Sequence, residues 1–534
     1  MENDSVSERK NKLKNFFLGW MTDNYDKLFL MILATAFLLR IWIFTKTLNQ
    51  PVWWDGADYM AAAIRWAGIN PNMIDMWYYR RGLFWPLFQA LFFKFGLGET
   101  GIRLALVFFS TGIVFVSYTL LKDMFNKKMA ILASICLSFS WIFMFFTGRT
   151  LNNLPGAFFL LTSLMFFWKG YVLKKGNKYI YLFGLFFAIT SLMRMQYVLS
   201  AIPLIIFVFI KERHRFLFNK HLWIAVGIFA IMFIPQFYLH YQHFGNPIAD
   251  LSKYYLGVGN SEKGEVGVRL AKTSDLFVYF NNLPYILDAN QKGYHTLFTF
   301  SPLYLIFLVG FFFFFLDAVL GFDRIFRDEE IQKKFFILIW ISISFLFLGY
   351  IAPHLEQRYI MDDIPFLFLI AVYPYAMIEG YLTKTFNMKP RTAFLFICLV
   401  LFLVLIPNII FGNNLIESKK TSYIEAKEAG LWIKENSNPT DVIISDSLPQ
   451  LTYYSERSVY PFNLAPRRDM ERKNESDLLD FIKTDKPKFM TLTAFENQDD
   501  WAMAFPQNHP DLVVPVQVYK QGEQPVFVIY EFKY

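Results

Sequence analysis

Long apolar runs recur along this chain, each close to the roughly twenty residues that a helix needs to cross a bilayer. About eleven can be counted, and the pair around Arg194 is short enough to form one kinked segment. The runs are 27–46, 101–121, 129–147, 151–170, 179–194, 197–210, 221–240, 299–320, 335–352, 358–380 and 391–411. A soluble protein with 55% hydrophobic and 20% aromatic residues would leave large apolar patches exposed. The sequence therefore predicts an α-helical polytopic membrane protein.

Basic side chains lie in every second loop between these runs. Loops rich in Lys and Arg face the cytoplasm, so the pattern predicts a cytoplasmic N-terminus, an odd number of spans and a C-terminus outside. The basic loop residues are Lys122, Lys127, Lys128, Lys169, Lys174, Lys175, Lys178, Lys211, Arg213, Arg215, Lys220, Arg324, Arg327, Lys333, Lys334, Lys384, Lys389 and Arg391. The basic residues of these loops account for the net charge of +8. The charge therefore indicates cytoplasmic loops beside the membrane, and we expect no nucleic-acid partner.

The organisation of the chain follows from these runs and from a change of composition after Gly412. The tail contains a helical pattern at 421–436 and strand patterns at 441–445, 513–519 and 525–530, which together predict a small α/β domain. The predicted parts are a cytoplasmic segment (1–26), a membrane domain (27–411) with long outside loops at 47–100 and 241–298, and an outside α/β domain (412–534).

Two further features indicate the membrane in which the chain resides. No small-residue cleavage site follows the first apolar run, so we expect a retained helix and not a removed signal peptide. Cys136 and Cys398 both lie in apolar runs, where they are expected to be small core residues and not disulfide partners. Together these features favour a prokaryotic cell membrane over the endoplasmic reticulum.

The first outside loop begins with Trp53-Trp54-Asp55-Gly56-Ala57-Asp58-Tyr59. Two carboxylates among aromatic side chains suit a general base that deprotonates an acceptor while a phosphate departs. The alternative is an interfacial aromatic belt in which Asp55 or Asp58 is the N-cap of a helix.

Arginines outside the cytoplasm are the second candidate group, because the positive-inside bias makes them uncommon there. Guanidinium groups bind phosphate oxygens in bidentate fashion. The candidates are Arg80 and Arg81 in the first loop, then Arg149, Arg194 and Arg358 in short loops. The alternatives are contacts with lipid headgroups or structural pairing, for example of Arg358 with Glu356 or Asp362.

Other chemistries find little support in the sequence. It contains no Walker loop, dinucleotide fingerprint or His-Glu-x-x-His motif, and its seven histidines lack zinc-ligand spacing. Asp55-x-x-Asp58 would suit a divalent metal only weakly, because two carboxylates make an incomplete ligand set. We therefore predict no metal ligands and no required cofactor.

These motifs together resemble the GT-C superfamily of membrane glycosyltransferases, and most closely its branch of dolichyl-phosphate-mannose protein mannosyltransferases and aminoarabinose transferases. Asp55 and Tyr59 match the Asp and the Tyr of that branch's Asp-Glu-x-x-Tyr motif. Arg81-Gly82-Leu83-Phe84 stands where the family has a Lys-Pro-Pro-Leu-like element, and Arg149 matches the Arg of its Ser-Arg-x-x-x-x-Asp stretch. Gln357-Arg358-Tyr359 resembles its late Arg-Tyr element. Similar segments are also found at 99–104, 432–436 and 453–457.

The resemblance implies inverting transfer of a sugar, with mannose suggested, from a polyprenyl or dolichyl monophosphate to a protein, glycan or lipid outside the cytoplasm. Asp55 would be the general base. The implied substrate-binding residues are Asp58, Tyr59, Arg80, Arg81, Arg149, Arg194, His354, Gln357, Arg358 and Tyr359. A metal is not required, because the lipid phosphate is itself an adequate leaving group.

The sequence departs from the family at three places. Gly56 replaces the Glu that follows the first Asp, Asn153 stands where a second acid is expected, and no Pro-Pro pair follows Arg81. Whether Asn153 replaces a catalytic acid, which sugar is moved and which acceptor receives it all stay open.

Two other classes remain as alternatives. A transporter or flippase of lipid-linked sugars would carry mid-membrane charges and repeated or broken helices. A binding or assembly module would use the tail but leave the loop arginines unexplained.

Trp53-Trp54-Asp55 also resembles part of the oligosaccharyltransferase signature, but that signature lies in a carboxyl-terminal domain, so it does not predict en bloc glycan transfer.

Overall fold

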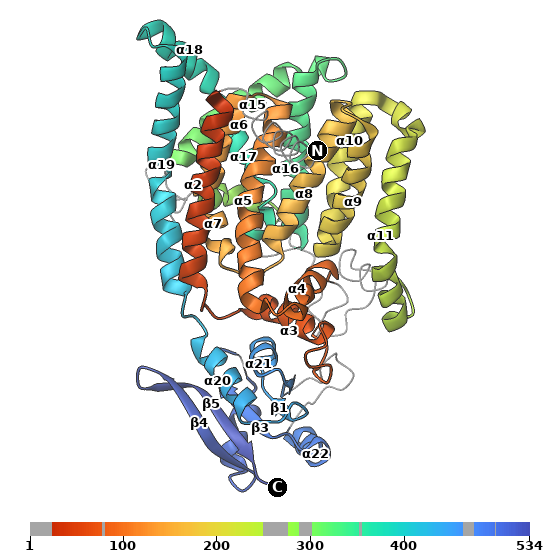
Figure 1. Ribbon diagram of the computed structural model, residues 1–534, viewed down its shortest axis with the longest axis vertical. Helices are drawn as coiled ribbons and strands as arrows, with labels where there is room; N and C mark the ends of the chain where they lie inside the picture. The colour runs from red at the N-terminus through yellow and green to blue at the C-terminus, as the bar shows by residue number, and fades with distance from the viewer. Residues whose placement is uncertain are drawn as a thin grey trace, which may run out of the picture. The chain divides into compact units, whose positions relative to one another are not determined.

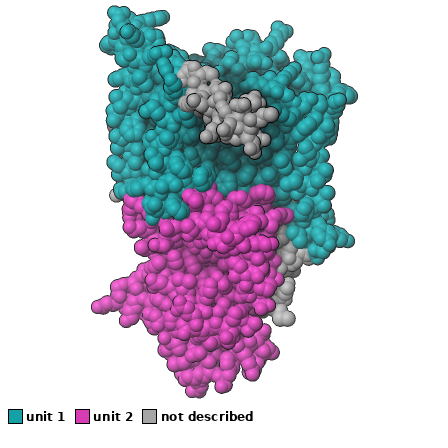
Figure 2. Space-filling view, viewed as in Figure 1, with its two compact units in different colours: residues 1–45, 106–147, 153–415 teal, residues 46–105, 148–152, 416–534 magenta. Residues whose placement is uncertain are grey.

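The computed structural model describes residues 24–76, 81–248, 276–287, 302–351, 355–462, 475–496 and 498–534. The chain divides into two compact units, coloured separately in Figure 2. We call residues 1–45, 106–147 and 153–415 the helical unit, and residues 46–105, 148–152 and 416–534 the tail unit. The glycine-rich stretch predicted at 257–267 lies outside the described residues.

Helices dominate the described part of the chain up to residue 419 (Figure 1). They are α2 (Asn24–Thr47), α3 (Trp54–Trp66), α4 (Phe84–Lys94), α5 (Gly98–Met124), α6 (Lys127–Phe139), α7 (Trp141–Thr147), α8 (Asn153–Phe167), η1 (Trp168–Val172), α9 (Asn177–Met193), η2 (Met195–Ser200), α10 (Ala201–Glu212), η3 (Arg213–Phe218), α11 (Lys220–Phe244), α13 (Val278–Asn281), α14 (Leu283–Leu287), α15 (Pro302–Leu320), η5 (Phe322–Arg324), α16 (Glu329–Ile351), η6 (Gln357–Ile360), α17 (Ile364–Ala371), α18 (Tyr375–Thr385) and α19 (Pro390–Lys419).

Eight helical segments among the described residues are long and apolar enough to cross a membrane, or nine if α6 and α7, bent by 51°, form one span. The chain is therefore an integral membrane protein, as predicted, with fewer full-length spans than the eleven expected. The two remaining runs are shorter helices: α8 has 15 residues before the π-helical turn η1, and α9 has 17. The helix breaks at Arg194, whose backbone is extended (φ −144°, ψ 107°).

A buried arginine inside the first span shows how the helical unit accommodates a charge in an apolar setting. Arg40 is fully buried, and its guanidinium donates to the Ser110 hydroxyl and to the carbonyl oxygens of Leu137 and Ser138. These hydrogen bonds satisfy the cation within the protein and join α2 to α5 and α6.

The tail unit contains a five-stranded mixed sheet. Its strands lie in the order β2 (Ser458–Tyr460), β1 (Val442–Ile444), β3 (Phe489–Thr493), β5 (Gln524–Phe532) and β4 (Val513–Gln521). β1 pairs in parallel with both β2 and β3, whereas β5 is antiparallel to β3 and β4. The predicted strands at 441–445, 513–519 and 525–530 are confirmed as β1, β4 and β5.

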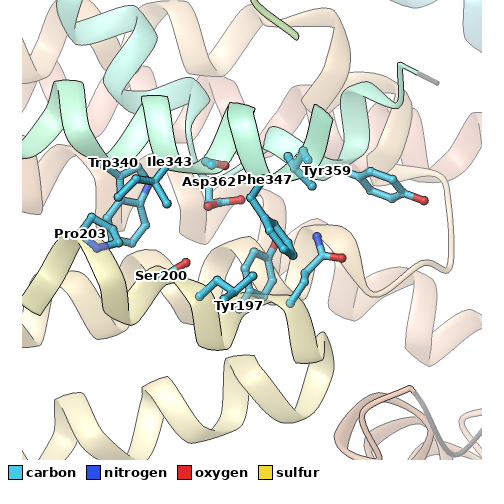
Figure 3. A pocket seen from close by; sticks show the side chains of 12 residues that line it. Tyr197, Ser200, Pro203, Trp340, Ile343, Phe347, Tyr359 and Asp362 are labelled. Atoms are coloured by element: carbon cyan, nitrogen blue, oxygen red, sulfur yellow. The ribbon is translucent and has the colours of Figure 1, made fainter. Parts of the chain in front are cut away.

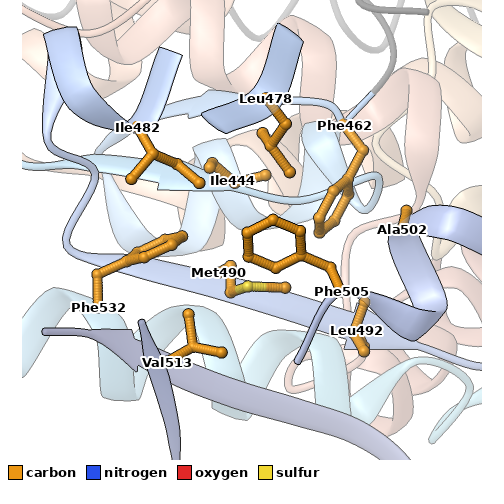
Figure 4. Close-up of a cluster of buried hydrophobic side chains, with 10 residues drawn as sticks. All are labelled: Ile444, Phe462, Leu478, Ile482, Met490, Leu492, Ala502, Phe505, Val513 and Phe532. Carbon is orange, nitrogen blue, oxygen red and sulfur yellow. The ribbon is translucent and has the colours of Figure 1, made fainter. Parts of the chain in front are cut away.

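Helices cover both faces of this sheet. α20 (Ile424–Glu435) and α21 (Leu448–Ser455) pack with Ile443 and Phe489 on one face. α22 (Glu475–Asp485) and α23 (Asp500–Asn508) contribute to the other core, which contains the neighbouring side chains Ile444 and Met490 (Figure 4). Because successive strand residues point to opposite faces, β1 and β3 each supply both cores.

Candidate active site

Helix α3 carries both carboxylates of the first-loop motif. It begins at Trp54, whose φ of 25° is unusual for a side chain of this size, and Trp53 is the N-cap residue. The alternative that an aspartate caps the helix therefore does not hold. Asp55 and Asp58 are three residues apart and so lie on one face of α3. The side chain of Asp58 is 6% exposed and that of Asp55 is 38% exposed.

Arg81 joins the two carboxylates. One terminal nitrogen of its guanidinium lies 2.7 Å from Asp55 Oδ1, and the other lies 2.9 Å from Asp58 Oδ2. The guanidinium also lies over the Tyr59 ring, 5.0 Å from its centroid. Four predicted site residues thus form one cluster, in which a planar cation bridges a buried acid and an accessible one.

The short segment 148–152 packs against α3 and explains one departure from the family motif. Asn152 Nδ2 donates to the Tyr59 hydroxyl at 2.9 Å. A Cβ at Gly56 would lie 2.8 Å from Thr150 Oγ1 and 3.1 Å from a methyl group of Val52. Any larger residue at position 56, including Glu, would therefore require this packing to shift.

Arg149 lies in the same segment and stacks on Trp53, with its guanidinium 3.3 Å from the ring centroid. It is 6% exposed, and burial, with a smaller effect of Arg103, lowers its pKa well below the usual range. A guanidinium stacked on an aromatic face keeps its edge available for hydrogen bonding.

Arg103 was not among the predicted site residues, yet it holds together the backbone around the cluster. Its guanidinium donates to the carbonyl oxygens of Thr47, Gln50 and Gly148 and pairs with Glu99 at 2.6 Å. These acceptors directly precede the segments that carry Asp55 and Arg149. Its position in the family-like segment 99–104 was the available signal.

The Tyr-Tyr pair of the tail packs beneath the same loop. The Tyr453 hydroxyl donates to Glu99 Oε2 at 2.7 Å, and the Tyr454 hydroxyl accepts from the Val52 amide at 2.6 Å. Burial raises the pKa of both tyrosines, so each hydroxyl keeps its proton. The tail segment at 453–457 therefore supports the backbone that leads into α3.

A second cluster lies within the helical unit, at the break between α9 and η2. The Arg194 guanidinium lies 4.8 Å from the Tyr359 ring centroid and 5.4 Å from that of Tyr197. Arg358 pairs with Glu356 at 3.2 Å, as the structural alternative predicted. The Asn153 amide donates to the Arg358 carbonyl oxygen at 3.1 Å.

A cavity of about 30 Å³ borders this second cluster, with Tyr197, Ser344, Tyr359 and Asp362 on its walls (Figure 3). Asp363 accepts a hydrogen bond from Ser344 Oγ at 2.6 Å. Asp362 and Asp363 are both buried. From the sequence, Asp362 was predicted only as a structural partner of an arginine, and Asp363 was missed although two adjacent acids follow Gln357-Arg358-Tyr359.

The predicted site residues therefore fall into two described groups. Asp55, Asp58, Tyr59, Arg81 and Arg149 lie in the tail unit; Arg194, Gln357, Arg358 and Tyr359 lie in the helical unit. Arg80 and His354 lie outside the described residues. Among the residues that the structure describes, no three His, Cys, Asp or Glu side chains form a metal-binding group, and both α3 aspartates pair with Arg81.

The fold is that of the GT-C membrane glycosyltransferases. ArnT from Cupriavidus metallidurans, solved with undecaprenyl phosphate bound, superposes with a TM-score of 0.61 at 13% identity, over 94% of this chain and 97% of that one. The Archaeoglobus fulgidus oligosaccharyltransferase also gives 0.61 at 13% identity, over 89% of this chain and 70% of that one. The archaeal oligosaccharyltransferase AglB from Archaeoglobus fulgidus, in complex with an inhibitory peptide and a dolichol-phosphate, gives 0.56 at 13% identity over the same shares.

One family model matches part of the chain. Residues 80–239 match the model of the dolichyl-phosphate-mannose-protein mannosyltransferase family. No curated protein matches the sequence. The resemblance to the GT-C superfamily predicted from the sequence is thus confirmed by the fold along nearly the whole chain and by the family match over part of it.

Proposed function

We propose that this chain is a glycosyltransferase that moves a sugar from a polyprenyl phosphate to an acceptor outside the cytoplasm. The observation that carries the proposal is the bridge from Arg81 to Asp55 and Asp58. It sets a guanidinium, a group suited to phosphate oxygens, beside an accessible carboxylate on α3. The polyprenyl phosphates bound by the Cupriavidus and Archaeoglobus proteins support a lipid-linked donor.

In the proposed reaction Asp55 is the general base. It takes the proton from the acceptor's nucleophilic atom as that atom attacks the anomeric carbon of the sugar. The bond from that carbon to the phosphate oxygen breaks with inversion, and the polyprenyl phosphate leaves with the electron pair. Arg81 stabilises the negative charge that develops on the phosphate. Asp58, buried and hydrogen-bonded to Arg81, positions the guanidinium and does not take the proton.

Arg81 would change partners during this cycle. Before the donor arrives, its two terminal nitrogens bind the two aspartates. A phosphate competes for the same nitrogens, so donor binding would weaken the contact with Asp55 and leave that carboxylate to the acceptor. Asp58, as the more buried partner, would retain its hydrogen bond.

The remaining assignments come from the family resemblance. Arg149, stacked on Trp53 in the tail unit, would help to neutralise the lipid phosphate. Donor-binding roles for Arg80, Arg194, His354, Gln357, Arg358 and Tyr359 stay predictions. So do mannose as the sugar, a protein, glycan or lipid as the acceptor, a cytoplasmic N-terminus and a prokaryotic membrane.

Incubation of the purified chain with radiolabelled polyprenyl phosphate sugars tests this function. We expect sugar to move to a water-accessible acceptor, or to be released slowly to water, with free polyprenyl phosphate as coproduct. Reconstitution in sealed vesicles separates the flippase alternative, which predicts that the donor crosses the bilayer with its sugar–phosphate bond intact. No cleavage with any polyprenyl phosphate sugar would reject the proposal.

A further inference from the structure

An apolar groove in the helical unit is separate from both clusters described above. Its volume is about 340 Å³, within the range of ligand sites in proteins. α9 supplies Phe183, Gly184 and Phe187, α10 supplies Leu204 and Ile205, and α11 supplies Val226 among other residues. The lining is almost entirely apolar, which suits a hydrocarbon chain and not a sugar.

The groove is closed where α9 packs against α11, and its sides are open. A Cβ at Gly184 would lie 2.5 Å from the Ala225 carbonyl oxygen, so α9 and α11 touch backbone to backbone at this point. Ile205 on α10 and Val226 on α11 are 56% and 53% exposed, and both line the groove. The groove is therefore accessible from the side of these helices, which Figure 1 shows next to one another.

One end of the groove is formed by the turn from η3 into α11. Phe216, Leu217 and Trp223 line it there, and the Trp223 indole N–H donates to the Leu217 carbonyl oxygen at 2.7 Å. That hydrogen bond fixes the turn and satisfies the polar edge of the indole. A half-exposed tryptophan with its N–H bonded is typical of the membrane interface.

The same turn is strongly basic. Arg215 directly precedes the lining residue Phe216, and Lys220 lies two residues before Leu222; both cations are exposed. The start of α9 lies close by, because the Tyr181 hydroxyl contacts His221 Nδ1 at 2.7 Å. That start brings Lys178, which is also exposed. Basic residues at the end of an apolar groove between membrane helices match the charge of an anionic lipid headgroup.

We propose that this groove binds an anionic phospholipid, with one acyl chain along α9 between α10 and α11 and the headgroup against Arg215 and Lys220. The charge of the turn selects the headgroup, and the apolar walls accept chains of any common length. The bound lipid fills the groove between α9, α10 and α11 and thereby steadies α10 and α11.

Native mass spectrometry of the full chain in detergent tests this site with two lipids of identical chains, phosphatidylglycerol and phosphatidylcholine. We expect one phosphatidylglycerol to be retained at about a tenfold lower lipid concentration than phosphatidylcholine. Arg215→Gln with Lys220→Gln should remove that preference. Val226→Trp, which fills the groove from its exposed side, should weaken retention of both lipids. Lys520→Gln with Lys533→Gln removes the same charge from the tail unit. This control should change neither the preference for phosphatidylglycerol nor the retention of either lipid.

Three results would overturn the proposal. One is equal retention of the two lipids, and another is an unchanged preference in the Arg215/Lys220 variant. The third is displacement of phosphatidylglycerol by an equimolar polyprenyl phosphate, which would show that the groove belongs to the sugar donor. Melting curves of each variant without added lipid confirm that a lost preference does not come from unfolding.

Discussion

Arg81 donates a hydrogen bond to the almost completely buried carboxylate of Asp58, 2.9 Å away. Removal of one partner of such a pair leaves the other buried without a countercharge. We expect Arg81→Gln to destabilise the chain by about 2 kcal/mol and to lower its melting temperature in detergent. Arg81→Gln combined with Asp58→Asn should recover most of that stability but not the transfer activity. An Arg81→Gln variant that melts like the parent would contradict the account.

The contact between Gly56 and Thr150 predicts a steric effect at the start of α3. Gly56→Ala places a methyl group 2.8 Å from Thr150 Oγ1 and should reduce stability by about 1–3 kcal/mol, with a loss of transfer as Asp55 shifts. Thr150→Ala removes the opposing atom, so the double variant should regain part of both properties. Gly227→Ala is a suitable control, since a Cβ there meets no neighbour within 4 Å. A single variant as active as the parent would show that the helix start is not constrained.

Asn153 donates its amide hydrogen to the Arg358 carbonyl oxygen, which a carboxylate cannot do. Asn153→Asp should therefore weaken the chain by about 1–2 kcal/mol and should not raise transfer. The initial rate of transfer and the melting temperature of Asn153→Asp, measured beside those of the parent and of Asn153→Ala, test both expectations. Higher activity in Asn153→Asp would mean that the position does serve a catalytic acid.

Glu496 makes the stability of the tail unit depend on pH. Its carboxyl accepts from Ser447 Oγ at 3.1 Å, and burial raises its pKa to about 7. The folded state therefore binds this proton more tightly than the unfolded chain does. The stability that the protonated group contributes is full below the unfolded pKa and is lost as the pH rises through about 7.

Thermal melting at about pH 5 and about pH 8 tests the effect, because Glu496→Gln should reduce the difference between the two melting temperatures. Glu523→Gln, at the exposed turn between β4 and β5, is the matched control and should leave the difference unchanged. An identical pH dependence in the parent and Glu496→Gln would contradict the assignment.

The loop charges predict the orientation of the chain, which cysteine labelling can measure in intact cells. Cys136 and Cys398 are buried, so the parent should react little with a membrane-impermeant maleimide. Lys520→Cys in the tail should be labelled from outside, whereas Arg215→Cys should be labelled only after permeabilisation. The reverse pattern would invert the topology and place α3 on the cytoplasmic side.

Much of the fold was predictable because its signals are periodic and local. Apolar runs of span length predicted the helices, and alternating residues predicted β4 and β5. The short strands β2 and β3 were missed. All five residues of β3 are buried although two of them are threonines, so their burial comes from packing that apolar content does not predict. The break at Arg194 was visible in the hydropathy as the boundary between the runs 179–194 and 197–210, whereas the 51° bend between α6 and α7 was not visible within the single run 129–147.

The cluster of Arg81 with the α3 side chains was predictable in part. Asp55, Asp58, Tyr59 and Arg81 stood out as unusual residue types in one loop, and the structure brings them together. Asn152 acts through a hydrogen bond to Tyr59, and Arg103 acts through hydrogen bonds to three carbonyl oxygens distant in the sequence. Only Arg103 had a signal in the sequence, its position in the family-like segment 99–104. The cap alternative failed because the helix begins at Trp54, with Trp53 as its N-cap residue. The rings of both tryptophans contact Tyr423, which local sequence could not predict.

The role of Asp55 is tested most directly by transfer of labelled sugar from polyprenyl phosphate with Asp55→Asn. The substitution keeps the shape of the side chain and one acceptor oxygen, so α3 should stay folded and the melting temperature should change little. We predict a loss of transfer of about 10²–10⁴-fold, with Asp511→Asn in the tail as active as the parent. Full activity of Asp55→Asn would contradict the assignment of the general base.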